Sequence, residues 1–388
     1  MPLVEERTQV RDVLARVGLG SLDPAVPAGE LSLANQQLVE IARALVRRSR
    51  VVILDEPWAV LSGDKLAGLH AVVAELAAQG SAVVYISHLL DEVAALADDV
   101  TVLRDGRHVS TGPAGGYPVD RIVTEMVGRS VDSMFPPRPE PAPDVVLSAR
   151  GLMPRSGSRV LAPVDLEVRA GEIVGVAGLV GSGRSRLLRT LAGVHPREAG
   201  EVEVDGRRVG ASLRAAMAAG VVLVPEERKT EGLVLDLSVA ANATLSTLSE
   251  VATLGWRSAR AERAAVAVEA DRLRIRAADP DQEVRQLSGS NQQKVAIARC
   301  LRVHPRVLLL DEPTRGVDIG AKAEIYRIIT ELAAAGMAIV LVSSELPEVL
   351  GLAHRVLVCR GGQVAGELSG AEMNEENVMH VAVGSGRL

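Results

Sequence analysis

The residues GLVGSGRS, 178–185, form a glycine-rich loop whose composition suits the binding of a phosphate group. Glycine lets the backbone turn tightly and approach a ligand closely, so that several N–H groups can point at one anion. An apolar stretch before the loop predicts a strand, and residues 185–193 predict a helix whose positive end adds to the attraction. We therefore expect a nucleotide to bind here. The residues expected to form the cradle are Gly178, Gly181, Ser182 and Gly183.

The last two residues of this loop, called the phosphate loop below, decide which chemistry it supports. The pattern G-x-x-x-x-G-K-[ST] has lysine at its seventh position, where this sequence has Arg184. Arginine keeps the positive charge but is bulkier and forked, so the exchange is not conservative at a tight phosphate site. Ser185 is placed to hold Mg²⁺. A plain turn without a ligand is the alternative, and the strand–loop–helix order argues against it.

Two apolar stretches end in Asp-Glu-Pro, at 51–57 and 307–313. At the end of a strand, each Asp could hold Mg²⁺ directly or through water, and each Glu could activate a water against a γ-phosphate. A single acidic pair at a strand end more often just faces solvent, but two pairs at a fixed distance from other motifs favour the functional interpretation. These carboxylates are Asp55, Glu56, Asp311 and Glu312.

Two serines stand just before segments with a helical pattern, Ser288 in LSGSNQQ, ahead of a helix expected at 291–301, and Ser32 in LSLANQQ. A serine at this place is most often a simple helix cap. Read with the other motifs, Ser288, Gly289 and the positive end of the helix could meet a γ-phosphate that another domain binds. In the other motif Leu33 replaces the glycine, and its side chain should hinder close approach of the backbone.

His88 follows the expected strand 83–87 and lies 32 residues beyond Glu56. A lone histidine is usually structural, but at the end of the next strand it could contact a γ-phosphate. Ser344 stands at the matching position later in the chain and offers neither charge nor ring.

The sequence contains a long internal repeat. LSLANQQLVEIARAL, 31–45, aligns without gaps with LSGSNQQKVAIARCL, 287–301, at an offset of 256 residues. The same offset aligns both Asp-Glu-Pro stretches and two further segments. Such a pattern indicates a duplicated domain.

A proline-rich segment at 134–144 divides the two copies and predicts a stiff, extended linker. Residues 1–133 then belong to the first copy and 145–388 to the second. By the offset, the phosphate loop of the first copy would lie before residue 1, so we expect only the C-terminal part of that copy here and a complete second copy.

Apolar runs without alternation predict parallel strands with both faces buried, and the segments between them predict helices. The fold class expected for the second copy is therefore α/β with a mostly parallel sheet. The expected strands are 172–179, 221–225, 306–313 and 338–344.

The composition bounds the function. The net charge of -6 argues against a nucleic-acid partner. No signal peptide is visible and no apolar run reaches the roughly 18 residues of a membrane span. Cys300 and Cys359 lie in apolar segments without metal-ligand spacing, which predicts buried free thiols.

Strand, phosphate loop, helix, LSGSNQQ and LLLDEP follow one another in an order that resembles the ATP-binding cassette family. More narrowly, the chain resembles the double-cassette ATPase subunits of bacterial monosaccharide importers of the ribose, xylose and galactose type. The resemblance covers essentially the whole chain and implies two cassettes, each with a phosphate-binding-loop fold, some antiparallel strands and a helical subdomain. The segments that carry it are 128–138, 178–185, 224–233, 287–295, 311–326 and 342–350.

The resemblance implies that two cassettes close face to face around two ATP molecules with Mg²⁺. One site would join the phosphate loop, Asp311, Glu312 and Ser344 to the segment around Ser32 and would hydrolyse ATP weakly. The other site would join Asp55, Glu56 and His88 to Ser288 and Gly289 and would do most of the work. The family's glutamine loop falls near Glu226, where the glutamine is absent. Trp58 and Ser62 stand where the second copy has Thr314 and Asp318. In the family, this loop is where the two cassettes touch across their dimer. The two departures therefore put in doubt how the working site is coupled to the other cassette.

The resemblance further implies a subunit held peripherally on the cytoplasmic face of a bacterial membrane. Its partners would be a transmembrane permease, met by the segment 232–286, and indirectly an extracytoplasmic solute-binding protein. Two alternatives stay open. One is a catalytically silent, truncated pair of cassettes that binds nucleotide and permease without turnover. The other is a soluble twin-cassette ATPase acting on ribosomes or DNA, which the acidic charge and short linker disfavour.

Overall fold

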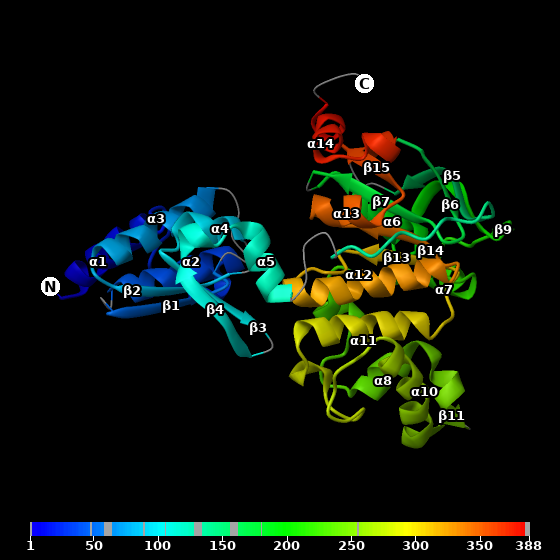
Figure 1. Ribbon diagram of the computed structural model, residues 1–388, viewed down its shortest axis with the longest axis horizontal. Helices are drawn as coiled ribbons and strands as arrows, with labels where there is room; N and C mark the ends of the chain where they lie inside the picture. The colour runs from blue at the N-terminus through cyan, green and yellow to red at the C-terminus, as the bar shows by residue number, and fades with distance from the viewer. Residues whose placement is uncertain are drawn as a thin grey trace. The chain divides into compact units, whose positions relative to one another are not determined.

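A computed structural model describes residues 2–46, 49–57, 64–87, 90–104, 106–127, 134–155, 162–179, 181–253 and 256–384. The chain divides into two compact units, Met1–Val131 and Asp132–Leu388, called unit 1 and unit 2 below. Both combine helices with strands (Figure 1). Within the described ranges, every helix is too short or too polar to cross a membrane.

Unit 2 is built on a six-stranded sheet in the order β10-β13-β14-β7-β15-β16. All neighbouring pairs are parallel except β15 and β16. Every residue of β13 and β14 is buried, as expected for apolar strands covered on both faces. The predicted α/β fold with a mostly parallel sheet is confirmed. The strands are β7 (Ile173–Gly178), β10 (Val221–Val224), β13 (Val307–Asp311), β14 (Ala338–Val342), β15 (Arg355–Arg360) and β16 (Gln363–Ser369).

One face of this sheet packs against helix α6 and a second, antiparallel sheet of order β6-β5-β8-β9. Val307, Leu309, Val340 and Val342 point to this side and are fully buried. The layer holds the helix that begins at the phosphate loop. Its elements are β5 (Val145–Pro154), β6 (Val164–Arg169), α6 (Arg184–Leu191), β8 (Arg197–Val204), β9 (Arg207–Arg208) and α7 (Leu213–Ala218).

The opposite face of the sheet is covered by long helices. Figure 1 shows α11 and α12 side by side, with α8 and α10 beyond α11. These helices form one hydrophobic core with the side chains that the sheet directs to this face. The elements are α8 (Val239–Thr244), α9 (Leu248–Val251), β11 (Ala252–Thr253), β12 (Trp256–Arg257), α10 (Ala259–Arg272), α11 (Gly289–Leu301), α12 (Ile319–Ala334), α13 (Leu346–Leu352) and α14 (Glu375–Val383).

Unit 1 repeats the second half of unit 2 element by element. Strands β1 and β2 pair in parallel, as β13 and β14 do, and β3 and β4 form a hairpin, as β15 and β16 do. The duplication predicted from the offset of 256 residues is therefore visible in the fold. The elements are α1 (Pro2–Arg16), α2 (Leu33–Val46), β1 (Val51–Asp55), α3 (Asp64–Ala78), β2 (Ala82–Ile86), α4 (Leu90–Leu96), β3 (Asp99–Arg104), β4 (Arg107–Pro113) and α5 (Val119–Val127).

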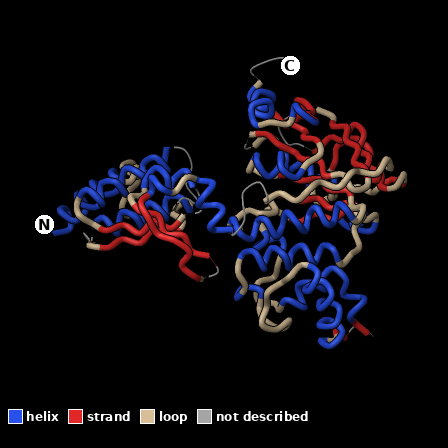
Figure 2. The backbone as a smooth tube through the Cα atoms, in the orientation of Figure 1, coloured by secondary structure: helices blue, strands red, loops and turns tan. Residues whose placement is uncertain are grey.

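The two parallel pairs differ in how their faces are covered. In unit 1 the strands lie along one side of the helices (Figure 2), and Val51, Ile53, Val84 and Ile86 are between 46% and 65% exposed. The side chains that match them in unit 2 are the four fully buried ones that face α6. Similar strand sequences are thus half-buried in one unit and fully buried in the other, because a second layer over that face is present in unit 2 but not among the residues that the structure describes in unit 1.

The proline-rich segment 134–144 contains no helix or strand and belongs to unit 2. Phe135 stacks on the ring of Tyr326, with centroids 4.9 Å apart. The carbonyl oxygen of Pro139 lies 2.7 Å from Nε2 of His354. The segment is thus without regular structure but is held to the rest of unit 2 by ring packing and a hydrogen bond.

Both cysteines are buried free thiols, as predicted. Burial raises the pKa of Cys300 to about 12 and that of Cys359 to about 11. Neither thiol is therefore expected to ionise near neutral pH.

A comparison of two glycines tests the packing behind α6. Gly193 (φ +68°) follows this helix, and a Cβ atom there would lie 2.5 Å from the backbone of Ser212, whereas at Gly206 (φ +72°) it would meet nothing within 4 Å. We expect Gly193→Ala to destabilise unit 2 by about 3 kcal/mol, and Gly206→Ala by only about 1 kcal/mol, because left-handed strain is common to both but overpacking is not. Scanning calorimetry of the full chain measures this. Equal losses would show that the contact between α6 and α7 is not tight.

Candidate nucleotide site

The phosphate loop lies between β7 and α6, at the edge of the sheet where the parallel strands end. Gly178 has a φ of +143°, and a Cβ atom there would stand 2.2 Å from the carbonyl oxygen of Cys359. Gly183 has a φ of +101° and precedes α6, which begins at Arg184, one residue earlier than expected. Only glycine meets these demands without strain. The spacing of the loop glycines is thus set by close backbone approach.

Two backbone hydrogen bonds fix the middle of the phosphate loop, one within the loop and one from Gly362. The Ser182 amide donates to the Leu179 carbonyl at 3.0 Å, and the Gly362 amide donates to the Ser182 carbonyl at 2.9 Å. The Ser182 hydroxyl is buried and makes no hydrogen bond. The loop is therefore held in a curved form from both sides.

Ser185 and Asp311 meet at the centre of the site. The Ser185 hydroxyl donates to Oδ1 of Asp311 at 2.8 Å, across 126 residues of sequence. Asp311 ends β13 and is fully buried, and its Oδ2 atom has no hydrogen-bond partner. Burial raises the pKa of Asp311 to about 6, and the nearby charge of Glu226 adds to the effect. A buried, unpaired carboxylate oxygen beside a hydroxyl is a donor set that a hard cation such as Mg²⁺ fits.

Arg184 reaches out of the loop to the ends of β13 and β14. Its Nη1 donates to the carbonyl oxygen of Ser343 at 2.7 Å, and its Nη2 lies 3.9 Å from Oε1 of Glu312. Both charged side chains are about nine-tenths buried, at 11% and 10% exposed. The cation of the phosphate loop therefore neighbours the candidate base.

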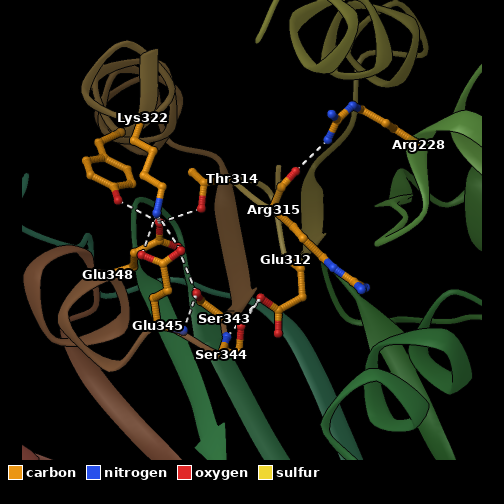
Figure 3. A network of polar contacts seen from close by, with 10 residues as sticks. Arg228, Glu312, Thr314, Arg315, Lys322, Ser343, Ser344, Glu345 and Glu348 are labelled. Atoms are coloured by element: carbon orange, nitrogen blue, oxygen red, sulfur yellow. Dashed lines mark hydrogen bonds and ion pairs between the residues drawn. The ribbon is translucent and has the colours of Figure 1, made fainter. Parts of the chain in front are cut away.

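Glu312 is also held by Ser344, which stands at the position that matches His88 and is called the switch position below. The amide and hydroxyl of Ser344 donate to Oε2 of Glu312 at 2.8 and 2.9 Å (Figure 3). Glu312 has a φ of +51°, and Glu56, its counterpart in unit 1, has a φ of +43°. Left-handed backbone is uncommon outside glycine and is often found at functional sites. Both copies thus place this glutamate in the same strained conformation.

A cavity of about 570 Å³ opens in front of the loop. Three arginines and two glutamates line it, so it combines attraction for a polyphosphate with acidic groups that can hold a cation or a water. Glu226 lies on its wall and forms an ion pair with Arg315. The lining residues used below are Arg184, Ser185, Glu226, Glu312, Arg315 and Ser344.

Ser288 and Gly289 do not line this cavity. Ser288 caps α11, where its hydroxyl accepts from the amide of Asn291 at 3.4 Å and from the side-chain amide at 2.9 Å. The helix therefore begins two residues before the expected start at 291. A Cβ atom on Gly289 would lie 2.9 Å from the carbonyl oxygen of Gly316, so this position too requires glycine.

The candidate residues of unit 1 are only partly described. Asp55 ends β1 and Glu56 follows it; both are exposed, and the amide of Glu56 donates to the carbonyl of Ile86 at 2.9 Å. The Ser32 hydroxyl accepts from the amide of Asn35 at 3.3 Å, as a helix cap does. His88 lies outside the described residues, as do Trp58 and Ser62.

Two features of the site were not anticipated from the sequence. Arg315 lines the cavity and neutralises Glu226, and a buried carboxylate, Glu348, lies directly behind the strand ends. The repeat contained a signal for the second feature, because the same offset aligns Glu92 with Glu348.

Comparison with known proteins agrees with this geometry. A family model described as ABC transporter matches residues 4–59 and 161–315. The chain belongs to the ABC transporter family. The match in two separate ranges agrees with two copies of one cassette. The predicted resemblance to the ATP-binding cassette family is confirmed.

Several curated relatives align with nearly the whole chain. The ribose import ATP-binding protein RbsA of Rhodococcus jostii (strain RHA1) is 46% identical over 379 residues, which cover 97% of this chain and 75% of the relative. The ribose import ATP-binding protein RbsA 1 of Streptomyces avermitilis is 47% identical, covering 96% of this chain and 70% of the relative. A putative ribose/galactose/methyl galactoside import ATP-binding protein of Rhizobium etli is 42% identical, covering 97% and 71%.

Solved structures show the same fold at low identity. A nucleotide-free ATP-binding cassette from an ABC transporter superposes with a TM-score of 0.54 at 21% identity, covering 61% of this chain and 95% of that one. The ADP conformation of MJ1267, an ATP-binding cassette of an ABC transporter, gives a TM-score of 0.52 at 22% identity, covering 62% and 95%.

The raised pKa of Asp311 predicts a pH-dependent effect of Asp311→Asn. The folded-state pKa of about 6 lies above the ordinary value of 3.8, so the wild type loses stability as the pH rises through this interval. Asparagine escapes this loss, and we expect the nucleotide-free variant to be more stable by about 2–3 kcal/mol at pH 7.5, with a much smaller gain at pH 4.5. Urea unfolding in EDTA at both pH values measures the difference. A gain that does not change with pH would contradict the raised pKa.

Proposed function

We propose that unit 2 binds ATP with Mg²⁺ in the cavity at the phosphate loop and that the chain energises the import of a monosaccharide or similar small polar solute. The single observation that carries the nucleotide site is the buried, unpaired oxygen of Asp311 beside the Ser185 hydroxyl, under a loop of glycines. The proposal that the solute is a monosaccharide is supported by the relatives named as ribose import ATP-binding proteins. The same relatives favour a role in transport over action on ribosomes or DNA.

Each residue of the site then has a chemical role. The N–H groups of the phosphate loop and the start of α6 hold the phosphates. Ser185 and Asp311 would hold Mg²⁺, which would supply positive charge against the charge that develops on the phosphates. Glu312 would accept a proton from the water that attacks the γ-phosphate, which yields ADP and phosphate. Glu226 would act in the place of the missing glutamine, with Arg315 balancing its charge.

We infer that this site turns ATP over slowly. To reach a phosphate, Arg184 has to leave the carbonyl of Ser343 and the carboxylate of Glu312. Ser344 supplies neither charge nor ring at the switch position. Binding without rapid hydrolysis follows from these two features.

In unit 1, we propose Asp55 for Mg²⁺, Glu56 as a base and His88 as a γ-phosphate contact for a second nucleotide. Ser32, Ser288 and Gly289 would each contact the γ-phosphate on a cassette that faces them. The left-handed backbone shared by Glu56 and Glu312 supports an equivalent role for the two glutamates.

The partner we propose is a transmembrane permease, with an extracytoplasmic solute-binding protein acting through it. The chain would then be peripheral on the cytoplasmic face of the membrane. The segment 232–286 is the surface we assign to the permease. It carries Trp256, which is 82% exposed, and a large exposed aromatic side chain is typical of a protein interface.

Replacing the Ser185 hydroxyl tests the cation site. We expect Ser185→Ala to lower ATP affinity at least about tenfold in the presence of Mg²⁺ and less than about twofold in EDTA, because only the metal contact is lost. Isothermal titration calorimetry of the full chain under both conditions measures this.

Ser212→Ala is the matched control, since Ser212 caps the short helix α7 and lies outside the cavity lining. It should leave both affinities unchanged. Equal losses with and without Mg²⁺ would show that Ser185 binds phosphate or shapes the loop rather than holding the metal.

A further inference from the structure

Glu348, in the first turn of α13, is a buried carboxylate to which the proposed chemistry assigns no role. Only 2% of it is exposed. Three hydroxyl groups donate to it, those of Thr314, Tyr326 at 2.6 Å and Ser343 at 2.7 Å. The Nζ atom of Lys322 lies 3.7 Å away. The carboxylate is therefore fully engaged, although it lies in the protein interior.

The three hydroxyl donors come from three different elements. Thr314 follows Glu312 by two residues, just beyond the end of β13, and Ser343 directly follows the last residue of β14. Tyr326 lies in α12, where its ring also stacks on Phe135. Figure 3 shows Thr314 and Ser343 on either side of the Glu348 carboxylate. Glu348 thus joins the segments that leave two neighbouring strands.

These two segments carry the reacting edge of the site. The residue after Ser343 is Ser344, whose amide and hydroxyl hold Glu312. The amide of Glu345 donates back to the Ser343 hydroxyl at 3.0 Å. A shift of either strand end would therefore change the hydrogen bonds that fix Glu312.

Unit 1 contains a related but less complete arrangement around a buried glutamate, in which both hydroxyl donors come from one strand and its end, and Oε1 of the glutamate has no hydrogen-bond partner among the described residues. Glu92 is 4% exposed and accepts from the hydroxyls of Tyr85 at 2.8 Å and Ser87 at 3.2 Å, and Nε2 of His70 lies 3.9 Å away. The offset of 256 residues aligns Glu92, Ser87 and His70 with Glu348, Ser343 and Tyr326. A buried carboxylate is costly to desolvate, and apolar packing could have replaced it in either copy. Its presence in both copies points to a role beyond stability.

We propose that Glu348 is a positioning residue for the ATP site of unit 2, which holds Thr314 and Ser343 so that Ser344 keeps Glu312 in place. The consequence of this inference, recognition of the γ-phosphate, rests on the proposed function. The hydrogen-bond network around Glu348 does not depend on that function. A network of hydroxyls around one carboxylate sets positions more narrowly than apolar packing does.

Thr314→Val tests the proposal, because it removes one hydroxyl and keeps the shape of the side chain. Thr330→Val is the matched control, since Thr330 is equally buried in α12 but bonds only to backbone carbonyls. Thr314→Ser restores the hydroxyl. Glu348→Gln is a second variant, whose amide nitrogen cannot accept from Ser343.

The first measurement is hydrogen–deuterium exchange in the nucleotide-free full chain. We expect the amides of Ser344 and Glu345 to exchange about five- to tenfold faster in Thr314→Val and Glu348→Gln, the factor for loss of about one buried hydrogen bond. Thr330→Val and Thr314→Ser should exchange as the wild type does. Faster exchange confined to residues next to the substitution would overturn the proposal, because Glu348 would then not link the two strand ends.

The second measurement compares the affinity of each variant for ADP and for the non-hydrolysable analogue AMP-PNP, with Mg²⁺. We expect Thr314→Val to lose about five- to tenfold in AMP-PNP affinity and less than about twofold in ADP affinity, since only the γ-phosphate meets this edge. Equal losses for both nucleotides would reduce Glu348 to a general structural role and overturn the proposal. A wild type that binds neither nucleotide would refute the proposed function, while the exchange result would still decide the positioning role.

Discussion

The hydrogen bond between Ser185 and Asp311 is the interaction on which the arrangement of the site depends. It joins the start of α6 to the end of β13, in a place where Asp311 has no access to solvent. Burying that carboxylate with one oxygen unpaired is unfavourable, as the raised pKa shows. The fold tolerates this cost because the parallel strands end at one edge and bring the carboxylate, the phosphate loop and Glu312 together. A cation and a polyphosphate at this edge would remove the imbalance.

Much of the fold and the centre of the site could be predicted from the sequence. Buried parallel strands read as unbroken apolar runs, so β7, β13 and β14 were expected close to where they lie. Asp311 was expected in the site because an acidic residue that ends such a run has to lie at the carboxyl edge. The glycines of the phosphate loop were likewise expected to allow close backbone approach and unusual dihedral angles, and Gly178 and Gly183 both have positive φ values.

Other features could not be predicted, because they depend on contacts between distant segments. Arg184 bonds to the carbonyl of Ser343, which lies 159 residues away, and its approach to Glu312 is a matter of side-chain reach. The surroundings of Glu348 depend on α12, α13 and two strand ends, which meet on it only in the folded chain. The early start of α11 followed from the way Ser288 caps the helix through Asn291. The attachment of the proline-rich segment to Tyr326 also became visible only in the fold.

The most direct test of the account is a crystal structure of the full chain with Mg²⁺ and AMP-PNP. The account predicts the phosphates inside the phosphate loop, the ion next to Ser185 and on the side of Oδ2 of Asp311, and Arg184 turned from the Ser343 carbonyl to a phosphate. A nucleotide bound elsewhere on unit 2, or an ion without either ligand, would contradict the central claim that this edge of the sheet is an ATP site.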